Sequence, residues 1–256
     1  MMVKRILKKL RRFRGGGDLE KDAGSYWNLS DSEERVQDQS HWCGVMRWNR
    51  ERWIEYGDFH LRLILTNLEV FAGPDYARRL AEKTALEWGC GGGSIVRPLC
   101  REFSRVYGAD ISAASLEECG RQMKALGLSN FWPVLFNAGD PESVLQSIPP
   151  GSVDVAASAG VFQHFPSKPY TRRVVRIMEE LVKPGGFALI QIRYFDGSEK
   201  LRQKESDYAQ NVIYMTSFTP EEFLPLLGDA GFTFLQRTRD PDGGEDRHDY
   251  YFVQKK

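Results

Sequence analysis

The sequence predicts an α/β fold in which a doubly wound, mostly parallel sheet of seven strands follows an N-terminal helical extension. The first supporting observation is the alternation of short apolar runs and amphipathic segments from residue 84 onward, which is typical of parallel βαβ units. The second is the glycine-rich stretch LEWGCGGGSIV, residues 86–96, between the first expected strand and the next helix. The third is the connection DPDGGEDRH between the last two strands, which is too short for a parallel crossover and predicts an antiparallel C-terminal hairpin.

The expected strands are short runs rich in apolar and β-branched residues, and they occupy residues 84–89, 105–111, 131–137, 153–160, 187–195, 232–239 and 249–255. The expected helices have apolar residues at helical spacing, and they occupy residues 94–103, 113–126, 170–182 and 220–230. Pro184-Gly185-Gly186 turns the chain from the third of these helices into the fifth strand.

The bulk composition is that of an ordinary globular chain of 256 residues, with 41% hydrophobic and 27% charged residues. Its four cysteines show no C-x-x-C spacing, so the pattern indicates neither a zinc site nor a redox motif, and no metal is expected. A reducing, cytoplasmic setting fits this cysteine usage best. The sequence contains no apolar run of about 18 residues, so no membrane-spanning helix is expected.

Three regions are expected along the chain. Residues 1–24 form a basic amphipathic segment and a glycine-rich linker, residues 25–83 an aromatic-rich helical cap, and residues 84–256 the main domain. Within the cap, residues 58–71 are expected to form a helix with Asp58 as its N-cap, followed by a second helix at 75–82.

The N-terminal stretch MMVKRILKKLRRFR, residues 1–14, carries seven basic and no acidic residues around an apolar face. Removing those seven from the 35 basic residues leaves 28 against 35 acidic residues, so nucleic-acid binding by the rest of the chain is not favoured. Two interpretations stay open. The stretch lies on an anionic inner membrane surface, or it is a basic tail that is either disordered and solvated or in contact with RNA or an acidic partner.

The glycine-rich turn suits a nucleotide-like ligand that lies close to the backbone. A dinucleotide pattern G-x-G-x-x-G that starts at Gly89 meets Ser94 at its third glycine position, so the match is imperfect. The alternative pattern starts with an acid and reads Glu87-x-Gly89-x-Gly91-x-Gly93. A carboxylate at this place would repel a pyrophosphate, whereas it suits a ligand that carries an ammonium group.

Asp110 stands at the end of the second expected strand, where an acid can accept both hydroxyls of a ribose. Together the motifs LEWGCGGG, VYGADIS, GDPESVLQSIPPGSVDVAASAGVFQHF and LVKPGGFALI, with the terminal hairpin, resemble the class I S-adenosylmethionine-dependent methyltransferases. The resemblance covers about residues 84–254 and follows the family's motif order. It implies a Rossmann-like domain, S-adenosyl-L-methionine as cofactor, and methyl transfer to an acceptor nucleophile.

The resemblance also assigns roles at the methionine end of the cofactor. Gly89, Gly91 and Gly93 are expected to let the methionine part run close to the backbone, and Glu87 to lie near its amino group. Ala159-Gly160-Val161, after the fourth strand, is expected to supply backbone contacts. For Glu87, an ion pair with a nearby cation is the alternative.

At the adenosine end, the resemblance implies that Asp110 binds the ribose hydroxyls and that Ile111 lies against the adenine. Asp140 matches the acid that accepts from the adenine amino group, and an Asx-turn before Pro141 is its alternative role. His164, in GVFQHF, is the candidate general base because it follows the fourth strand at the ligand-binding edge. Support of the loop by a hydrogen bond is the competing role for this histidine.

The expected acceptor is a small molecule or a glycan. A hydroxyl of a sugar, glycan or lipid-linked molecule is preferred, and this preference depends on the membrane interpretation of the basic residues 1–14. Two other functions stay open. One is a nicotinamide-dependent oxidoreductase that uses the same glycine turn, and the other is a non-catalytic scaffold that binds the cofactor.

Overall fold

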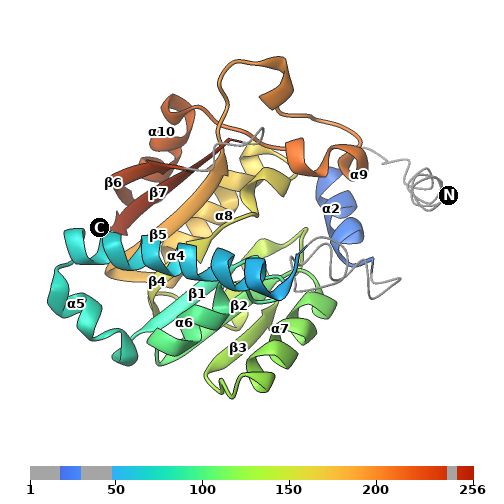
Figure 1. The fold of residues 1–256 in the computed structure, drawn as a ribbon. Helices are drawn as coiled ribbons and strands as arrows, with labels where there is room; N and C mark the ends of the chain where they lie inside the picture. The colour runs from blue at the N-terminus through green and yellow to red at the C-terminus, as the bar shows by residue number, and fades with distance from the viewer. Residues whose placement is uncertain (1–17, 30–47, 241–246) are drawn as a thin grey trace.

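The computed structural model describes residues 18–29, 48–240 and 247–256, and these include a seven-stranded sheet (Figure 1). Its strands are β1 (Thr84–Trp88), β2 (Arg105–Asp110), β3 (Phe131–Leu135), β4 (Val153–Ser158), β5 (Val182–Arg193), β6 (Phe232–Arg239) and β7 (His248–Lys255). The spatial order is β3-β2-β1-β4-β5-β7-β6. Strands β1 to β5 pair in parallel, and β7 pairs antiparallel with both β5 and β6. The predicted fold class, including the antiparallel C-terminal strands, is confirmed.

Helices cover both faces of the sheet (Figure 1). The first face carries α4 (Arg50–Phe71), α6 (Val96–Glu102) and α7 (Ala113–Ala125), and the second carries α8 (Lys168–Leu181) and α10 (Pro220–Ala230). Successive residues of β1 divide between the two cores, with Ala85 in the first and Leu86 in the second. Burial of apolar side chains on both sides explains why the central strands read as nearly continuous apolar runs.

Shorter elements complete the described chain. They are α2 (Leu19–Trp27), α5 (Pro74–Arg78), α9 (Tyr208–Asn211) and the 3₁₀ turns η1 (Leu80–Glu82), η2 (Pro141–Gln146), η3 (Phe162–His164), η4 (Glu199–Leu201) and η5 (Val212–Tyr214). Helix α2 contacts α9, so two segments that are far apart in the sequence lie side by side (Figure 1). The expected boundary between residues 24 and 25 falls inside α2.

Two expectations about the cap were wrong. Helix α4 does not begin at Asp58 but at Arg50, where the Asn49 side chain accepts a hydrogen bond from the Arg52 N–H. Asp58 lies inside the helix and its carboxylate pairs with the buried guanidinium of Arg97. The expected helix at 75–82 is divided into α5 and η1. Tertiary contacts therefore override the local break that Gly57-Asp58 suggests.

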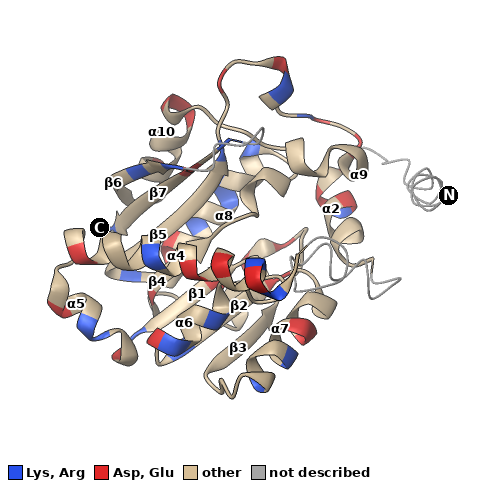
Figure 2. Ribbon diagram, viewed as in Figure 1, with Lys and Arg blue, Asp and Glu red and all other residues tan. Residues whose placement is uncertain are grey.

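Charged residues occur mainly in the helices and loops, while the central strands contain few of them (Figure 2). Among the described helices, none combines the length and the apolar character that crossing a membrane requires. Residues 1–14, on which the membrane interpretation depends, lie outside the described residues.

Candidate functional site

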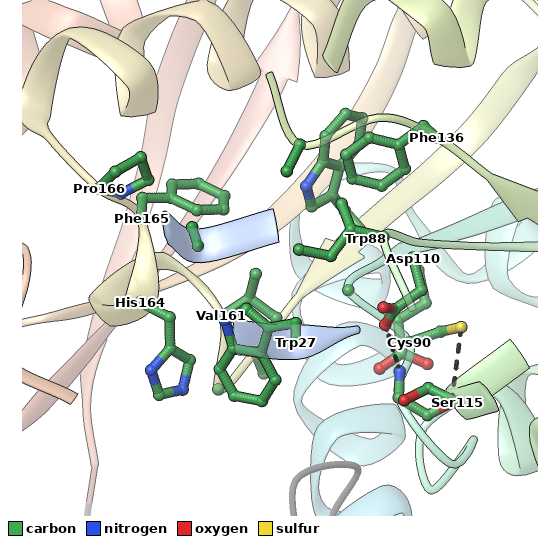
Figure 3. A pocket seen from close by; sticks show the side chains of 18 of the residues that line it. Trp27, Trp88, Cys90, Asp110, Ser115, Phe136, Val161, His164, Phe165 and Pro166 are labelled. Carbon is green, nitrogen blue, oxygen red and sulfur yellow. Dashed lines mark hydrogen bonds between the residues drawn. The ribbon is translucent and has the colours of Figure 1, made fainter. Parts of the chain in front are cut away.

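A pocket lies at the carboxyl ends of β1, β2 and β4, beside the point where the strand order reverses. This is the usual place for a ligand in a doubly wound sheet, because the loops that follow neighbouring strands diverge there. Figure 3 shows Asp110, Cys90 and Ser115 toward one end of the pocket and His164, Phe165 and Pro166 toward the other. The pocket is therefore built from separate segments that the sheet brings together.

The glycine turn after β1 forms the floor of the first end. The N–H groups of Gly89 and Cys90 both donate to the Ala109 carbonyl, at 2.7 and 3.2 Å, which ties the turn to β2. Gly89 has φ +76°, and a Cβ on it would stand 2.3 Å from a methyl carbon of Val161. Only glycine fits both the backbone conformation and this close approach.

Asp110 closes the same end from β2. Its two carboxylate oxygens accept from the backbone N–H groups of Gly91 at 2.9 Å and Ser112 at 2.8 Å. Burial raises the pKa of Asp110, while these hydrogen bonds act in the opposite direction. Each oxygen keeps a further lone pair, so the carboxylate is oriented to accept from two neighbouring hydroxyl groups of a ligand.

Glu87 is the second acid of the pocket, and its side chain is buried, with 2% exposure. The Val96 N–H donates to its carboxylate, but the Oε2 atom has no hydrogen-bond partner among the described residues. Burial raises the pKa of Glu87 well above its usual value. An unpartnered buried carboxylate oxygen on a pocket wall is suited to a ligand that brings a cationic donor.

Aromatic side chains surround the other end. Trp27 of α2 lies with its ring centroid 5.0 Å from that of His164, and its Nε1 donates to the Tyr208 hydroxyl at 2.8 Å. Tyr208 in turn donates to the His164 carbonyl at 2.6 Å. The His164 Nδ1 lies 2.8 Å from the carbonyl oxygen of Val212, which can only accept, so Nδ1 carries the proton. With the proton on Nδ1, Nε2 is the ring atom that can act as a base, and it lies 3.3 Å from the side-chain nitrogen of Gln163.

Most of the predicted site residues meet in this pocket. They are Glu87, Gly89, Gly91, Asp110, Ile111, Ala159 and His164. Gly93 does not line the pocket, and its missing side chain instead leaves room for the Cys119 sulfur, 2.5 Å from where a Cβ would stand. Asp140 is exposed at the start of η2 and does not line the pocket either, whereas Phe136 and Ala138 before it do.

Other lining residues have no motif that marks them in the sequence. Tyr56 comes from α4, Tyr208 from α9 and Tyr170 from α8. Burial raises the pKa of Tyr56, and the nearby Glu87 adds to this effect. The aromatic richness of the cap was a visible signal for Trp27 and Tyr56, but it pointed equally to core packing.

Comparison with known proteins agrees with this arrangement. The family model described as a methyltransferase domain matches residues 86–188. The chain is 31% identical over 177 residues to a ubiquinone biosynthesis O-methyltransferase of Burkholderia orbicola. The matched region covers 62% of this chain and 72% of that protein. A second such enzyme, from Serratia proteamaculans, is 32% identical over 105 residues.

The solved structure of magnesium protoporphyrin IX methyltransferase from Synechocystis, with bound S-adenosylhomocysteine, has the same fold. It superposes with a TM-score of 0.62 over 93% of this chain and 100% of that chain, at 16% identity.

The fold, the pocket and these relatives together show that the chain belongs to the class I S-adenosylmethionine-dependent methyltransferases. The match spans 40% of the length of the Serratia relative, and between 41% and 45% of the length of four others with the same name.

S-adenosylmethionine is the cofactor of this family, and the residues of the pocket fit it. The cofactor has a cationic ammonium group, which matches the unpartnered Oε2 of Glu87. It also has two ribose hydroxyls, which match the doubly anchored carboxylate of Asp110. Ile111, Phe136 and Ala138 offer an apolar surface for an adenine ring beyond Asp110.

Proposed function

We propose that the protein transfers the methyl group of S-adenosylmethionine to a hydroxyl of a small, largely apolar molecule. The observation that carries this proposal is the pocket, in which a cofactor-type end with Glu87 and Asp110 continues into an aromatic end with His164. When bound, S-adenosylmethionine supplies a methyl group that its sulfonium has already activated. The protein's part is then to align the acceptor and exclude water.

Cofactor binding is assigned to the residues of the first end. Glu87 would accept from the ammonium group, and Asp110 would accept from the ribose hydroxyls. Gly89 and Gly91 keep side chains out of the space beside the pocket. Gly93 would act indirectly, by letting the turn pack on α7, and Asp140 would act through the shape of the loop before η2.

The aromatic end favours an apolar acceptor. Among the described residues that line the pocket there is no lysine or arginine, and Trp27, Phe165, Tyr170 and Tyr208 supply ring surface. This chemistry suits a ring-containing molecule. The names of the relatives, which refer to ubiquinone biosynthesis and magnesium protoporphyrin IX, support a small-molecule acceptor. A free sugar or glycan is less favoured because few polar side chains face its hydroxyls, whereas a lipid-linked ring remains compatible.

His164 is assigned the role of general base toward the acceptor hydroxyl. The hydrogen bond from Nδ1 to the Val212 carbonyl fixes the tautomer in which Nε2 is basic. The Trp27 ring packs against the imidazole and limits its rotation. The N–H of Gln163 beside Nε2 would give way to the acceptor hydroxyl when the acceptor binds.

Binding measurements test the cofactor and the oxidoreductase alternative together. By calorimetry, S-adenosylhomocysteine is expected to bind more tightly than NAD, and Asp110→Ala is expected to weaken its binding by about 1–3 kcal/mol because a charged acceptor is lost. Tighter binding of NAD would contradict the methyltransferase assignment, and an unchanged dissociation constant in Asp110→Ala would contradict the role of that residue.

Turnover tests the acceptor class and the scaffold alternative. Formation of S-adenosylhomocysteine is measured with two apolar phenols, 4-tert-butylcatechol and 2-naphthol, and with two sugars, glucose and N-acetylglucosamine. We expect turnover with a phenol and none with the sugars. Turnover with a sugar alone would reverse the acceptor assignment, and tight cofactor binding without turnover on any probe would favour the scaffold.

Glu87 gives a pH-dependent prediction. Because burial raises the pKa of Glu87 in the free protein, part of the population holds a proton there above the usual pH range of a carboxyl group. Binding of the ammonium group favours the ionised form and releases that proton, so the affinity for S-adenosylhomocysteine should rise with pH across the raised pKa. Calorimetry in buffers of different ionisation enthalpy measures the released proton. Glu87→Gln should bind more weakly and release none, and equal release by both proteins would contradict the assignment.

A further inference from the structure

A chain of four hydrogen bonds runs behind the pocket and links α4 to the turn after β4. The His60 Nδ1 lies 2.7 Å from the Tyr56 carbonyl oxygen, and the His60 Nε2 lies 3.2 Å from the Tyr250 hydroxyl. The side-chain nitrogen of Gln191 donates to that hydroxyl at 2.8 Å, and the Gly160 N–H donates to the Gln191 side-chain oxygen at 2.5 Å. These hydrogen bonds join four elements that are distant in the sequence, namely α4, β7, β5 and the loop after β4.

Each link has a definite direction. The Tyr56 carbonyl can only accept, so the His60 Nδ1 donates to it. Burial lowers the pKa of His60 to about 4, so the ring is neutral near pH 7 and its Nε2 accepts from the Tyr250 hydroxyl. The oxygen of Tyr250 then accepts from the Gln191 amide, whose own oxygen accepts from Gly160. Removal of the Tyr250 hydroxyl would therefore take away the donor to the His60 Nε2 and the acceptor for the Gln191 amide nitrogen.

The residues that form these hydrogen bonds are buried, which makes the loss of a partner costly. The exposed fractions of His60, Tyr250 and Gln191 are 1%, 2% and 4%, so bulk water cannot replace a missing partner. The rings of Tyr56, Phe59 and Tyr250 surround the imidazole at centroid distances of 4.3, 5.1 and 5.5 Å. These contacts hold His60 in one orientation.

The last hydrogen bond of this series, at Gly160, reaches the pocket. Gly160 has φ +71° and lies between Ala159 and Val161, and all three residues line the pocket. Val161 also fills the space beside Gly89 in the glycine turn. Loss of the hydrogen bond from the Gly160 N–H to Gln191 would thus move both the Gly160 turn and Val161 beside the glycine turn. The methionine end of a cofactor is expected to lie between these two segments.

We propose that His60 is a positioning residue for cofactor binding, which acts through Tyr250 and Gln191 to hold the Gly160 turn in its binding shape. His60 thereby links the packing of α4 on the sheet to the affinity of the pocket for the cofactor. This inference rests on the proposed function, because it takes the bound molecule to be S-adenosylmethionine or its product. His60 itself does not line the pocket, so its effect is transmitted and not a direct contact.

Tyr250→Phe is the sharpest test, because it removes one oxygen from the middle of the chain and keeps the ring. The matched control is Tyr251→Phe. The Tyr251 side chain is fully buried in the core on the opposite face of the sheet, and its hydroxyl has no hydrogen-bond partner among the described residues. We expect Tyr250→Phe to weaken S-adenosylhomocysteine binding by about tenfold or more, and Tyr251→Phe to change it less than twofold.

Hydrogen exchange of the Gly160 amide separates this effect from general destabilisation, which would accelerate exchange at neighbouring amides as well. In the free wild-type protein the Gly160 amide proton should resonate downfield and exchange slowly with solvent, because its hydrogen bond to the buried Gln191 side chain is short. Tyr250→Phe and His60→Phe should each accelerate this exchange more than that of neighbouring β4 and β5 amides. The double variant should bind S-adenosylhomocysteine no more weakly than the worse single variant, since one chain is broken in both.

Equal effects of Tyr250→Phe and Tyr251→Phe on affinity, or a Gly160 amide that does not respond to Tyr250→Phe, would overturn the inference. If His60→Phe fails to fold, the Tyr250→Phe comparison still decides it. A wild-type protein that binds no S-adenosylhomocysteine would instead overturn the proposed function and the cofactor part of this inference. The Gly160 amide would then still report whether the chain of hydrogen bonds holds the turn.

Discussion

Gly57→Ala is expected to lower the melting temperature by several degrees and to weaken S-adenosylhomocysteine binding by at least about tenfold. A Cβ at this position in α4 would stand 1.9 Å from the carbonyl oxygen of Ser94 and 2.8 Å from its carbon. These are backbone atoms of the glycine turn, so either the helix or the turn must shift. Overpacking of this kind costs about 1–3 kcal/mol, which exceeds the roughly 0.5–1 kcal/mol that alanine contributes over glycine in a helix.

Gly228→Ala in α10 is the matched control. A Cβ built on Gly228 meets no heavy atom within 4 Å, so only the helix-propensity effect remains there. This variant should melt at the same temperature or slightly higher, by about 2–4 °C for each kcal/mol gained, and should bind S-adenosylhomocysteine normally. Thermal unfolding and calorimetry on both variants decide the matter. If Gly57→Ala matched Gly228→Ala in both measurements, α4 would not be in tight contact with the glycine turn.

The same turn of α4 explains why a helix outside the matched family domain matters for the site. Four nearly consecutive residues make four different contacts: Tyr56 lines the pocket, Gly57 meets the glycine turn, Asp58 pairs with Arg97 of α6, and His60 bonds to Tyr250 of β7. The pocket is thus assembled only when this helix is docked on the sheet. Cofactor affinity and the stability of the cap should therefore change together in variants of this helix turn.

The sequence predicted the elements whose signals are local. The strand and helix alternation after residue 84 and the hairpin both depend on short-range patterns, and the structure has them. Helix α10 has the bounds that were predicted for it. In the structure, a capping box at Thr219 and Glu222 begins the helix, and Gly231, with φ +107°, ends it. The parallel arrangement was predicted from the alternation of strands and helices, and the antiparallel hairpin from the short connection between the last two strands.

The start of α4 could not be predicted in this way. Gly57-Asp58 has the local character of a break and a cap, and the sequence contains no sign that the Ser94 backbone and Arg97 lie beside it. Gly57 allows the close approach to the Ser94 backbone, and Asp58 pairs with Arg97. Both residues therefore serve tertiary packing and do not mark a helix end. Local propensity is a weak guide wherever a long-range contact decides the conformation.

The same division between local and long-range signals applies to the site. The placement of Glu87, Gly89, Gly91 and Asp110 in the pocket was predictable because it depends on position at or just after the end of a strand. Tyr56 and Tyr208 reach the pocket from segments about 150 residues apart in the sequence, and only the folded chain brings them together. Asp140 was expected near the adenine because of the resemblance to the family, yet it is exposed in the structure, and Ala138 lines the pocket in its place.

His164→Ala is expected to lower kcat by about 100-fold or more, the usual contribution of a general base, while the dissociation constant of S-adenosylhomocysteine changes little. The reason is the fixed tautomer: with Nδ1 bonded to the Val212 carbonyl, Nε2 is the atom that can take the acceptor proton. The reaction rate is measured with 4-tert-butylcatechol at saturating cofactor. Since loss of a base acts on the transition state and not on cofactor binding, the two measurements separate the roles.

Tyr208→Phe is the control for loop support, because it removes the hydroxyl that joins Trp27 to the His164 carbonyl and leaves the imidazole in place. It should loosen the aromatic end and raise KM for the phenol, with a much smaller loss of kcat than His164→Ala. His164→Gln, which keeps a polar side chain of similar reach but no basic nitrogen, should be as slow as His164→Ala. Recovery of the rate in His164→Gln, or a joint loss of cofactor affinity and stability in His164→Ala, would show that His164 supports the loop and is not the base.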